Sequence, residues 1–188
     1  HIVYDFQEQF KDEGIDSFYN MYTAGLTPNP CIKCNIYFKF GALYDKAMEL
    51  GFDALATGHY ARVCHEREGN CIKKAKDQSK DQSYVLYFID SNMLSNIIFP
   101  LGSSLKRDIQ KIAIKLGLFK DIEESQDICF IPENNDYISY FETFKDYKPN
   151  PGIFKLLSGE IVGKYDDFNA YTIGQRKGLG IAYSEPLY

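Results

Sequence analysis

Hydrophobic residues along the chain recur at two different spacings. In the first part they return every three or four positions, as in the runs around Phe18 and Phe40, which is typical of amphipathic helices. Further along, short apolar runs flank the turn pair Ser158-Gly159, which is typical of a β-hairpin. The pattern therefore predicts an α/β domain over 1–147 followed by a small β-rich domain over 148–188.

Capping residues indicate where two of the helices begin and end. Asn35 is a favourable N-cap for a helix that Gly51 would end, and Ser104 and Gly117 bracket a later helix in the same way. The later helix is expected to bury its apolar side chains, namely Leu105, Ile109, Ile112, Ala113 and Leu116.

Short apolar runs between the helices predict strands. The run over 52–59 ends in Thr-Gly-His, which is typical of a buried parallel strand that delivers residues to its C-terminal edge. Further strands are expected at His1–Phe6 and at Ile128–Ile131, and residues 62–74 are expected to form a two-stranded ribbon. The alternation of strands and helices favours a parallel α/β sheet.

Composition and charge narrow the class of protein. A formal net charge of −5 does not indicate a nucleic-acid binder, although basic residues cluster locally at 73–80 and at 176–177. No apolar stretch is long enough to cross a bilayer and no signal peptide is seen, so we expect a soluble cytoplasmic protein without membrane contact. Because the chain starts without methionine and within a strand-like run, we expect it to be part of a longer polypeptide.

The five cysteines offer several kinds of chemistry. An odd number without an export signal argues against a disulfide scaffold. The Cys31-x-x-Cys34 pair could hold a metal, cycle as a redox pair or supply a nucleophile. Cys34 lies near the predicted helix start, where the helix dipole would stabilise a thiolate. We interpret Cys64 and Cys71 as structural or incidental, and Cys129 taken by itself as a packing residue.

Two polar motifs have both a functional and a structural interpretation. Gly58 would let the backbone approach a ligand closely, but a simple turn beside a hydrogen-bonded His59 explains the same residues equally well. The tetrapeptide Lys-Asp-Gln-Ser occurs twice in tandem, at 76–79 and at 80–83, and a polar loop accounts for it unless one copy has a function.

Taken together, five segments in order resemble the bacterial tRNA-specific 2-thiouridylases. The resemblance spans nearly the whole chain and is far more specific than a Cys-x-x-Cys pair alone. The matching segments are GLTPNPCIKCN at 25–35, ALATGHYARV at 54–63, KDQSYVLY at 80–87, SQDICFI at 125–131 and YTIGQRKGLGI at 171–181.

The resemblance implies a fold and an activity. The fold is an adenine nucleotide alpha hydrolase-like (ATP pyrophosphatase) domain followed by the start of a β-rich tRNA-binding domain. The activity is that of a tRNA-uridine 2-sulfurtransferase, in which ATP and Mg²⁺ serve to adenylate the C2 oxygen of the wobble uridine. A cysteine persulfide then supplies the sulfur and AMP leaves. The implied partners are tRNAs of the Lys, Glu and Gln type and a persulfide donor protein.

The resemblance also assigns roles to individual residues. Cys129 corresponds to the cysteine that carries the persulfide. Cys34 corresponds to the nucleophile that releases the sulfur and forms a disulfide with Cys129. Gly58 corresponds to a contact with ATP. The implied contacts with tRNA are Asn29, Pro30, Cys31, His59, Lys80, Asp81 and Gln82.

The chain departs from the family pattern at two places. The family's Ser-Gly-Gly-x-Asp-Ser phosphate loop does not occur in the sequence, so we expect an N-terminally truncated domain that does not adenylate a substrate by itself. Many members also carry aspartate where this chain has Cys31. Three thiolates, from Cys31, Cys34 and Cys129, could hold a [4Fe–4S] cluster with one open iron, and this is the alternative to the persulfide route.

Two other kinds of protein are alternatives to a tRNA-thiolating enzyme. One is an ATP pyrophosphatase that acts on a small molecule, against which the KDQSY and GQRKGLG segments argue. The other is a non-enzymatic cysteine-rich metal-binding module, which stoichiometric zinc without ATP-dependent thiolation would favour. No glycine-rich loop of the kind that binds S-adenosylmethionine occurs in the sequence, which argues against methyl transfer.

Overall fold

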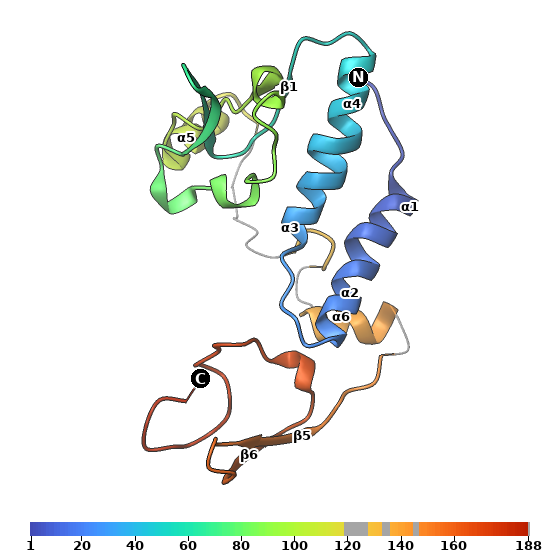
Figure 1. The fold of residues 1–188 in the computed structure, drawn as a ribbon, viewed down its shortest axis with the longest axis vertical. Helices are drawn as coiled ribbons and strands as arrows, with labels where there is room; N and C mark the ends of the chain where they lie inside the picture. Colours follow the sequence, from blue (N-terminus) through green and yellow to red (C-terminus); the bar gives the residue numbers. More distant parts are fainter. Residues whose placement is uncertain (119–127, 133–135, 145–146, 188) are drawn as a thin grey trace. The chain divides into compact units, whose positions relative to one another are not determined.

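The chain divides into two compact units in the computed structural model, which describes residues 1–118, 128–132, 136–144 and 147–187 (Figure 1). Unit 1 comprises His1–Phe10 and Pro30–Gln126, and unit 2 comprises Lys11–Asn29 and Asp127–Tyr188. Within the described residues, no helix has both the length and the apolar character needed to cross a membrane.

The first helical stretch runs from residue 7 to residue 23 and belongs partly to each unit. It consists of α1 (Gln7–Gln9), a π-helical segment (Phe10–Asp16) and α2 (Ser17–Thr23). Residues 1–6, which the sequence predicted as a strand, have no regular structure. A strand needs a hydrogen-bonded neighbour, and none of the described strands pairs with this segment.

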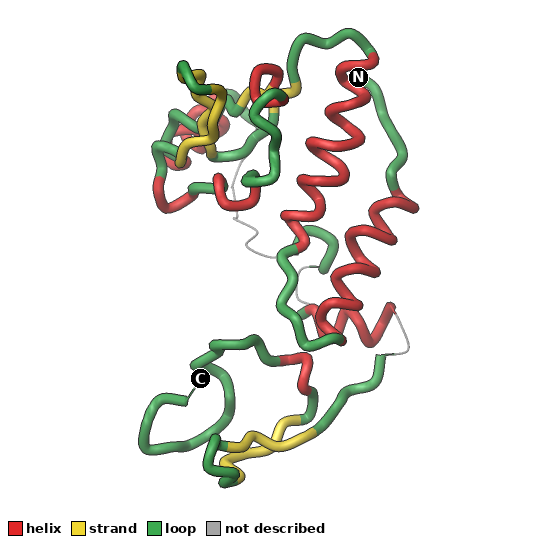
Figure 2. The backbone as a smooth tube through the Cα atoms, viewed as in Figure 1, coloured by secondary structure: helices red, strands yellow, loops and turns green. Residues whose placement is uncertain are grey.

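The second helical stretch begins five residues earlier than predicted. It consists of α3 (Pro30–Lys33), a π-helical segment (Cys34–Ala42) and α4 (Leu43–Glu49), and Figure 2 draws it as one helical path. Proline suits a first helical position, because its missing N–H has no partner there in any case. The prediction that Asn35 caps this helix is therefore wrong, and Asn35 lies buried inside it.

Two glycines shape this second helical stretch. Gly41 has non-helical backbone angles, and a Cβ at this position would lie 2.7 Å from the carbonyl oxygen of Ile36, so the kink needs glycine. Gly51 adopts a φ of 78° and donates to Met48, while Phe52 donates to Ala47. This is a Schellman ending, as the sequence predicted.

Unit 1 contains a parallel strand pair and an antiparallel hairpin. β1 (Leu55–Ala56) pairs in parallel with β4 (Ile97–Ile98), which confirms the parallel pairing expected for residues 52–59. The expectation that this strand is buried is wrong, because Leu55 is half-buried and Ala56 is exposed. β2 (Ala61–Glu66) and β3 (Gly69–Lys74) form the predicted ribbon. The short 3₁₀ helices of this unit lie at Gln78–Lys80, Ser83–Val85 and Met93–Asn96.

The core of unit 1 is mainly aliphatic. It forms where the strand pair, the hairpin and the 3₁₀ segments meet, and Phe40 from the second helical stretch completes it. Its buried members are Phe40, Ala61, Val85, Leu86, Ile89, Leu94, Ile97 and Phe99.

Helix α5 (Lys106–Lys115) differs from its prediction at its start and on its apolar face. Leu105, not Ser104, precedes the first turn, and the carboxylate of Asp77 accepts a hydrogen bond from the Lys106 N–H at 3.0 Å. None of the helix residues is buried, and Ile112 is 54% exposed. The predicted stop at Gly117 is confirmed, with a φ of 69°.

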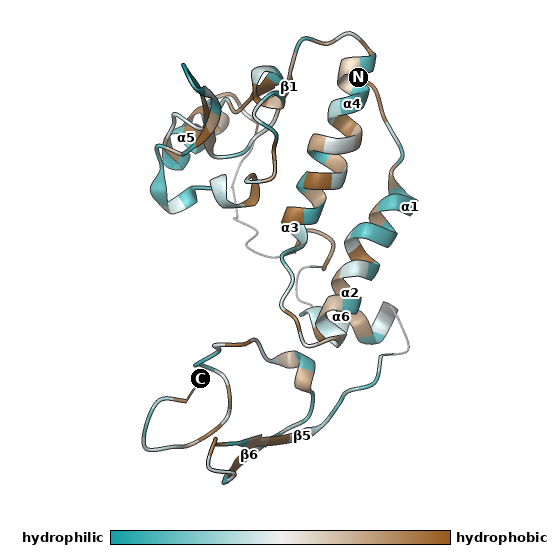
Figure 3. Ribbon diagram, viewed as in Figure 1, coloured by the Kyte–Doolittle hydropathy of each residue, from teal (hydrophilic) through white to brown (hydrophobic). Residues whose placement is uncertain are grey.

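Unit 2 combines α2 and α6 (Tyr137–Phe144) with a hairpin of β5 (Gly152–Lys155) and β6 (Ile161–Tyr165). The hairpin and its turn were predicted, and Figure 3 shows hydrophobic stretches within β5 and β6. A 3₁₀ turn follows at Phe168–Ala170.

The core of unit 2 is aromatic. Phe18, Tyr22 and Phe141 are buried, and the rings of Phe18 and Phe141 lie 5.6 Å apart. Tyr137 stacks on Tyr22 with ring centroids 4.4 Å apart. Ring pairs of this kind add to the free energy gained from burial, so this cluster ties α2 to α6.

Candidate functional site

Cys31 and Cys34 lie one helical turn apart near the start of the second helical stretch. Cys31 is exposed and Cys34 is half-buried. Positions i and i+3 are neighbours on a helix surface, with Cβ atoms about 5–6 Å apart. Because the helix starts at Pro30, Cys31 occupies its first turn and Cys34 its second. The dipole effect that we expected at Cys34 therefore acts more strongly on Cys31, since it fades beyond the first turn.

Asn35 attaches the helix segment that carries Cys31 and Cys34 to the interior of unit 1. Its side chain is only 2% exposed, and its amide donates to the carbonyl oxygen of Val85 at 3.3 Å. Its side-chain oxygen has no hydrogen-bond partner among the described residues. A buried amide oxygen without a partner costs free energy, so Asn35 contributes to the position of this segment more than to stability.

Gly58 and His59 follow β1 directly, at the C-terminal edge of the parallel pair. The ladder extends one residue further, because the Thr57 N–H donates to Ile98 at 3.1 Å. Gly58 is exposed, and among the described residues a Cβ there would meet only Leu101, at 3.9 Å. The strand edge therefore leaves open backbone at Gly58, which fits the approach of a ligand such as a nucleotide.

His59 is a buried, neutral histidine. Its ring packs between Phe40 and Phe99, with centroids 5.7 and 5.9 Å away, and its Nδ1 lies 2.8 Å from the hydroxyl of Thr57. Burial, with a smaller contribution from the charge of Lys39, lowers the pKa of His59 to about 4. The ring therefore carries no charge at neutral pH.

The second Lys-Asp-Gln-Ser copy is held in place by its own side chains. The carboxylate of Asp81 accepts from the Ala75 N–H at 2.7 Å and from the Ser83 hydroxyl at 2.7 Å. Burial opposes ionisation of Asp81, but these hydrogen bonds outweigh it and the pKa of Asp81 is lowered. Gln82 accepts from the Tyr60 N–H at 3.0 Å and returns its own N–H to the Tyr60 carbonyl at 2.8 Å.

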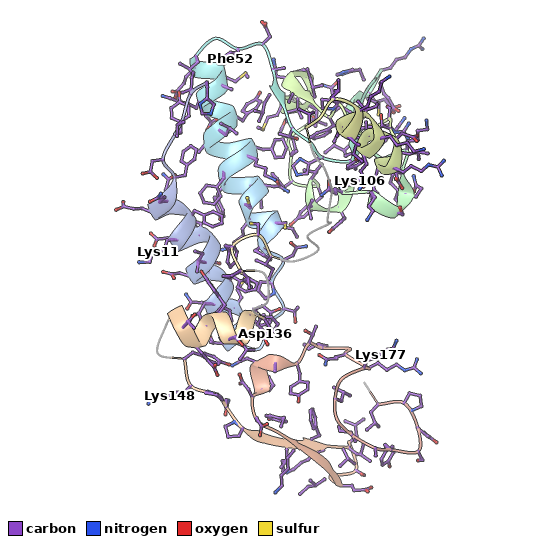
Figure 4. All side chains as sticks on the ribbon, turned by 180° about the vertical axis from the view of Figure 1, so that it is seen from behind. Lys11, Phe52, Lys106, Asp136, Lys148 and Lys177 are labelled. Atoms are coloured by element: carbon purple, nitrogen blue, oxygen red, sulfur yellow. The ribbon has the colours of Figure 1, made fainter. Side chains whose placement is uncertain are left out.

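A basic groove lies beside this copy. It is lined by Lys80 together with residues from the start of α5, among them Lys106 and Arg107. Lys106, labelled in Figure 4, also places its ammonium group 5.7 Å from the ring centre of Tyr60. Asp77 belongs to the same groove, and its pKa is lowered by the Lys106 N–H and by Ser79. Lysines and arginine gathered in this way suit a phosphate group.

The loop over 171–181 in unit 2 is folded by a glutamine and by glycines. Gln175 accepts from the Thr172 N–H at 3.0 Å and donates to the Lys177 carbonyl at 3.0 Å. Three glycines with positive φ accompany it, at Gly174, Gly178 and Gly180. The loop exposes Arg176 and Lys177, and the latter is labelled in Figure 4.

Cys129 lies exposed on a turn and not in a strand, so the strand prediction for Ile128–Ile131 is wrong. The Ile131 N–H donates back to Ile128 at 2.9 Å, which closes the turn. Ile128, Phe130 and Ile131 all pack against the aromatic cluster of unit 2. The apolar neighbours of Cys129 thus anchor the turn, while Cys129 itself is exposed. The preceding Ser-Gln-Asp of this motif lies outside the described residues.

The structure brings together some of the predicted site residues. Gly58, His59, Lys80, Asp81 and Gln82 belong to unit 1 and are connected through Tyr60. Pro30, Cys31 and Cys34 also belong to unit 1, whereas Asn29 and Cys129 belong to unit 2. The three-cysteine cluster remains a prediction, because only two of its thiols lie in the same unit.

One candidate group was missed in the sequence. The thiols of Cys64 and Cys71 lie 2.8 Å apart across the β2–β3 hairpin, with the carboxylate of Glu66 nearby. The predicted ribbon over 62–74 could have indicated this group, because the pairing of its two strands decides which residues face each other across the hairpin.

Comparison with known proteins places the chain in a family. Residues 1–133 match the family model described as the tRNA methyl transferase HUP domain, and residues 143–188 match the model described as the tRNA methyl transferase PRC-barrel domain. This agrees with the predicted nucleotide hydrolase-like α/β domain followed by a β-rich domain.

Curated relatives carry the name tRNA-specific 2-thiouridylase MnmA. One from Leptospira interrogans is 48% identical over 187 residues, which is 99% of this chain and 49% of the relative. One from Chloroflexus aurantiacus is 44% identical over 188 residues, which is 99% of this chain and 52% of the relative. The chain thus spans about half the length of the curated relatives it matches. On the match of both domains and this degree of identity, the chain belongs to the MnmA/TrmU family.

Proposed function

We propose that this chain is part of an ATP-dependent tRNA-uridine 2-sulfurtransferase that converts the wobble uridine of tRNA to 2-thiouridine. The observation that carries the proposal is the state of the two cysteines in the family's segments. Cys129 is exposed on an anchored turn, and Cys34 is half-buried on a helix. A thiol that receives sulfur from a donor protein must be accessible, and a firmly held turn limits the entropy lost when the donor binds.

The proposed chemistry uses two thiols. ATP would adenylate the C2 oxygen of the uridine and release pyrophosphate, and Mg²⁺ would neutralise phosphate charge. Cys129 carries the persulfide, and the thiolate of Cys34 attacks its inner sulfur. This forms a disulfide between Cys34 and Cys129 and frees hydrosulfide, which adds at C2 and expels AMP. Two external thiols then reduce the disulfide and are themselves oxidised to a disulfide, so each turnover consumes one ATP, one persulfide sulfur and two thiols.

Two basic regions support tRNA as the substrate. The groove of Lys80, Lys106 and Arg107 offers phosphate contacts in unit 1, and Arg176 and Lys177 offer them in unit 2. Gln82 holds the backbone at Tyr60 and Asp81 holds it at Ala75, so in our proposal they present Lys80 to the tRNA rather than bind it alone. We propose that His59 contributes to tRNA binding by positioning its own segment, since the residue is only 7% exposed.

We also propose roles for further residues of the site and for the partners of the reaction. Asn29, Pro30 and Cys31 would line the pocket for the flipped base, and Gly58 would contact ATP. The tRNAs would be those with Lys, Glu and Gln anticodons, the sulfur donor would be a protein persulfide, and the reaction would take place in the cytoplasm.

The test is a thiolation assay with the full-length protein. Purified protein, unmodified tRNA, ATP, Mg²⁺, a persulfide source and a thiol reductant are incubated, and 2-thiouridine is measured by nucleoside mass spectrometry. Cys34→Ala and Cys129→Ala are each expected to reduce product at least about 10³-fold, as for loss of a nucleophile. Cys71→Ser removes a cysteine outside the site and is the matched control, with activity near that of the parent. Unchanged thiolation in both alanine variants would refute the assigned roles.

The same preparation separates the persulfide from the iron–sulfur route. The protein is purified without oxygen, and its iron content and visible spectrum are recorded before the assay. Full activity in colourless, iron-free protein supports the persulfide. Activity that follows an iron content lost in Cys31→Ser would support the cluster.

A further inference from the structure

Cys64 and Cys71 are directly opposed partners in the β2–β3 hairpin. The register pairs Cys64 with Cys71, one pair further from the turn than His65 with Asn70. Residues opposite each other in an antiparallel pair have Cα atoms about 4.5–5.5 Å apart. This range lies inside the span of about 4.4–6.8 Å that a disulfide tolerates, so the backbone need not move to allow one.

The two sulfur atoms already touch. Sγ of Cys64 lies 2.8 Å from Sγ of Cys71 and 3.6 Å from the Cys71 carbonyl oxygen, and both side chains are half-buried. Closing a disulfide from this position requires the sulfurs to approach by only ~0.8 Å.

A charged pair lies beside the thiols on the same face of the hairpin. Alternate residues of a strand share a face, which places Glu66 with Cys64 and Lys73 with Cys71. Lys73 contacts the carboxylate of Glu66 at 2.5 Å. Lys73 interacts with Glu66 first and also with Cys64, and both interactions raise the pKa of Lys73. The hydrogen bond to Cys64 and then burial raise the pKa of Cys71, which therefore stays protonated to a higher pH than an ordinary thiol.

From this geometry we propose that Cys64 and Cys71 form a redox-active dithiol that closes to a cross-strand disulfide on reaction with a small-molecule disulfide such as oxidised glutathione. This site is separate from the cysteines of the proposed thiolation reaction. Its existence does not depend on that function.

The reaction balances as two exchanges. The Cys64 thiolate, beside Lys73, attacks one sulfur of glutathione disulfide, which forms a mixed disulfide and releases one glutathione thiolate. Cys71 then loses its proton to solvent and attacks the Cys64 sulfur, which forms the Cys64–Cys71 bond and releases the second glutathione thiolate. The protein is oxidised by two electrons and one glutathione disulfide is reduced to two glutathiones.

The competing reading is a metal site made of Cys64, Cys71 and Glu66, whose donor atoms lie within 4.8 Å of one another. Two observations favour the disulfide. Thiolates that share a tetrahedral zinc stand about 3.8 Å apart, given Zn–S bonds of about 2.3 Å, and these sulfurs are closer than that. The carboxylate of Glu66 is also already engaged by Lys73.

Tryptic mapping provides a direct test, because Arg67 lies between the two cysteines. Cleavage after Arg62, Arg67 and Lys73 separates the peptides Val63–Arg67 and Glu68–Lys73. The full-length protein is equilibrated with excess glutathione disulfide, its remaining thiols are alkylated, and the digest is analysed by mass spectrometry. We expect the two peptides to appear joined in the majority of molecules and to separate after reduction.

Single variants show which thiol acts. Cys71→Ser is expected to stop at the mixed disulfide of Cys64 with glutathione, and Cys64→Ser is expected to yield no joined peptides. Cys31→Ser, which removes another cysteine of unit 1, is expected to leave the joined peptides unchanged.

Two outcomes would overturn the proposal. One is that both peptides of the parent protein remain separate and alkylated at saturating glutathione disulfide. The other is one equivalent of zinc that survives dialysis, disappears in Cys64→Ser and protects both thiols from glutathione disulfide, which would make the group a metal site.

Discussion

The two units bury their polar side chains in opposite ways. In unit 2 the carboxylate of Asp167 is 6% exposed and accepts hydrogen bonds from the N–H groups of Asn150 and Asn169, both at 3.1 Å, and from the hydroxyl of Tyr147. In unit 1 His59 is 7% exposed among aromatic rings, and the oxygen of Asn35 has no hydrogen-bond partner among the described residues.

This difference distinguishes buried polar side chains that stabilise the fold from those that position the candidate site. Asp167 joins the chain before β5 to the chain after β6, and Tyr137 extends this network by donating to the Asn169 carbonyl at 3.1 Å. Burial and the hydrogen bond to Asp167 raise the pKa of Tyr147, so its proton stays in the network. Asn169 also has a side-chain oxygen without a partner among the described residues, so the contrast concerns Asp167 and not every polar atom of unit 2.

Removing Asp167 should have the largest effect on stability. Asp167→Ala would leave two backbone N–H groups and one hydroxyl without an acceptor, and we expect the free energy of unfolding to fall by about 3–4 kcal/mol. Asp167→Asn keeps an acceptor oxygen and should cost about half as much. Urea denaturation followed by tyrosine fluorescence measures both. A loss below about 1 kcal/mol in the alanine variant would mean that the network is not needed for the fold.

Acid should weaken unit 1 through His59. The folded pKa of about 4 lies below the ordinary value of 6.5, so the unfolded chain binds the proton more readily between these values. The stability due to neutral His59 is complete above pH 6.5 and is lost as the pH falls toward 4, by at most about 3 kcal/mol. Unfolding of the parent and of His59→Gln at pH 7.5 and pH 4.5 gives the comparison. The variant should lose less stability than the parent, and equal losses would contradict the assignment.

Replacing Asn35 should have a smaller effect than replacing Asp167. Asn35→Leu removes one hydrogen bond to Val85 together with an unsatisfied oxygen, so we expect a change within about 1 kcal/mol. Thermal unfolding monitored by circular dichroism measures the change, and the thiolation assay shows whether the site still works. A loss as large as that of Asp167→Ala would remove the contrast between the two units.

Gly58→Ala should leave stability almost unchanged. Within the part of the chain that the structure describes, the added Cβ meets only Leu101, at an ordinary contact distance of 3.9 Å, so the free energy of unfolding should shift by less than about 0.5 kcal/mol. If ATP approaches this backbone as we propose, its affinity should fall at least about tenfold. Calorimetric titration of the full-length protein with ATP measures this, with Ala56→Gly on the preceding strand as a control for backbone changes nearby.

The sequence predicted local structure correctly at positions where the backbone conformation requires one residue type. The glycine stops at Gly51 and Gly117 and the turn at Ser158-Gly159 were predicted because positive φ angles favour glycine. The start of the second helical stretch was not, because both Pro30 and Asn35 are acceptable there and only tertiary packing, which buries Asn35, decides between them.

The site was predicted less completely than the fold. The resemblance pointed to Cys34, Cys129 and the second Lys-Asp-Gln-Ser copy, but not to the hydrogen bonds by which Asp81 and Gln82 hold the backbone. Such bonds join residues up to 22 positions apart and leave no periodic pattern. The same holds for Asp77, whose contact with the start of α5 spans 29 positions.

The β2–β3 hairpin also has a consequence for chain length. Only Arg67 and Glu68 separate the paired residues Glu66 and Gly69. The length of this turn determines the register of the residue pairs along both strands. Insertion or deletion of a single residue in one strand would shift the register by one position and turn Cys71 to the opposite face from Cys64. The tip is hydrophilic in Figure 3 and would otherwise accept length changes easily. Homologues that keep both cysteines should therefore also keep the spacing between them, whereas those that lack either one should vary in length at this turn.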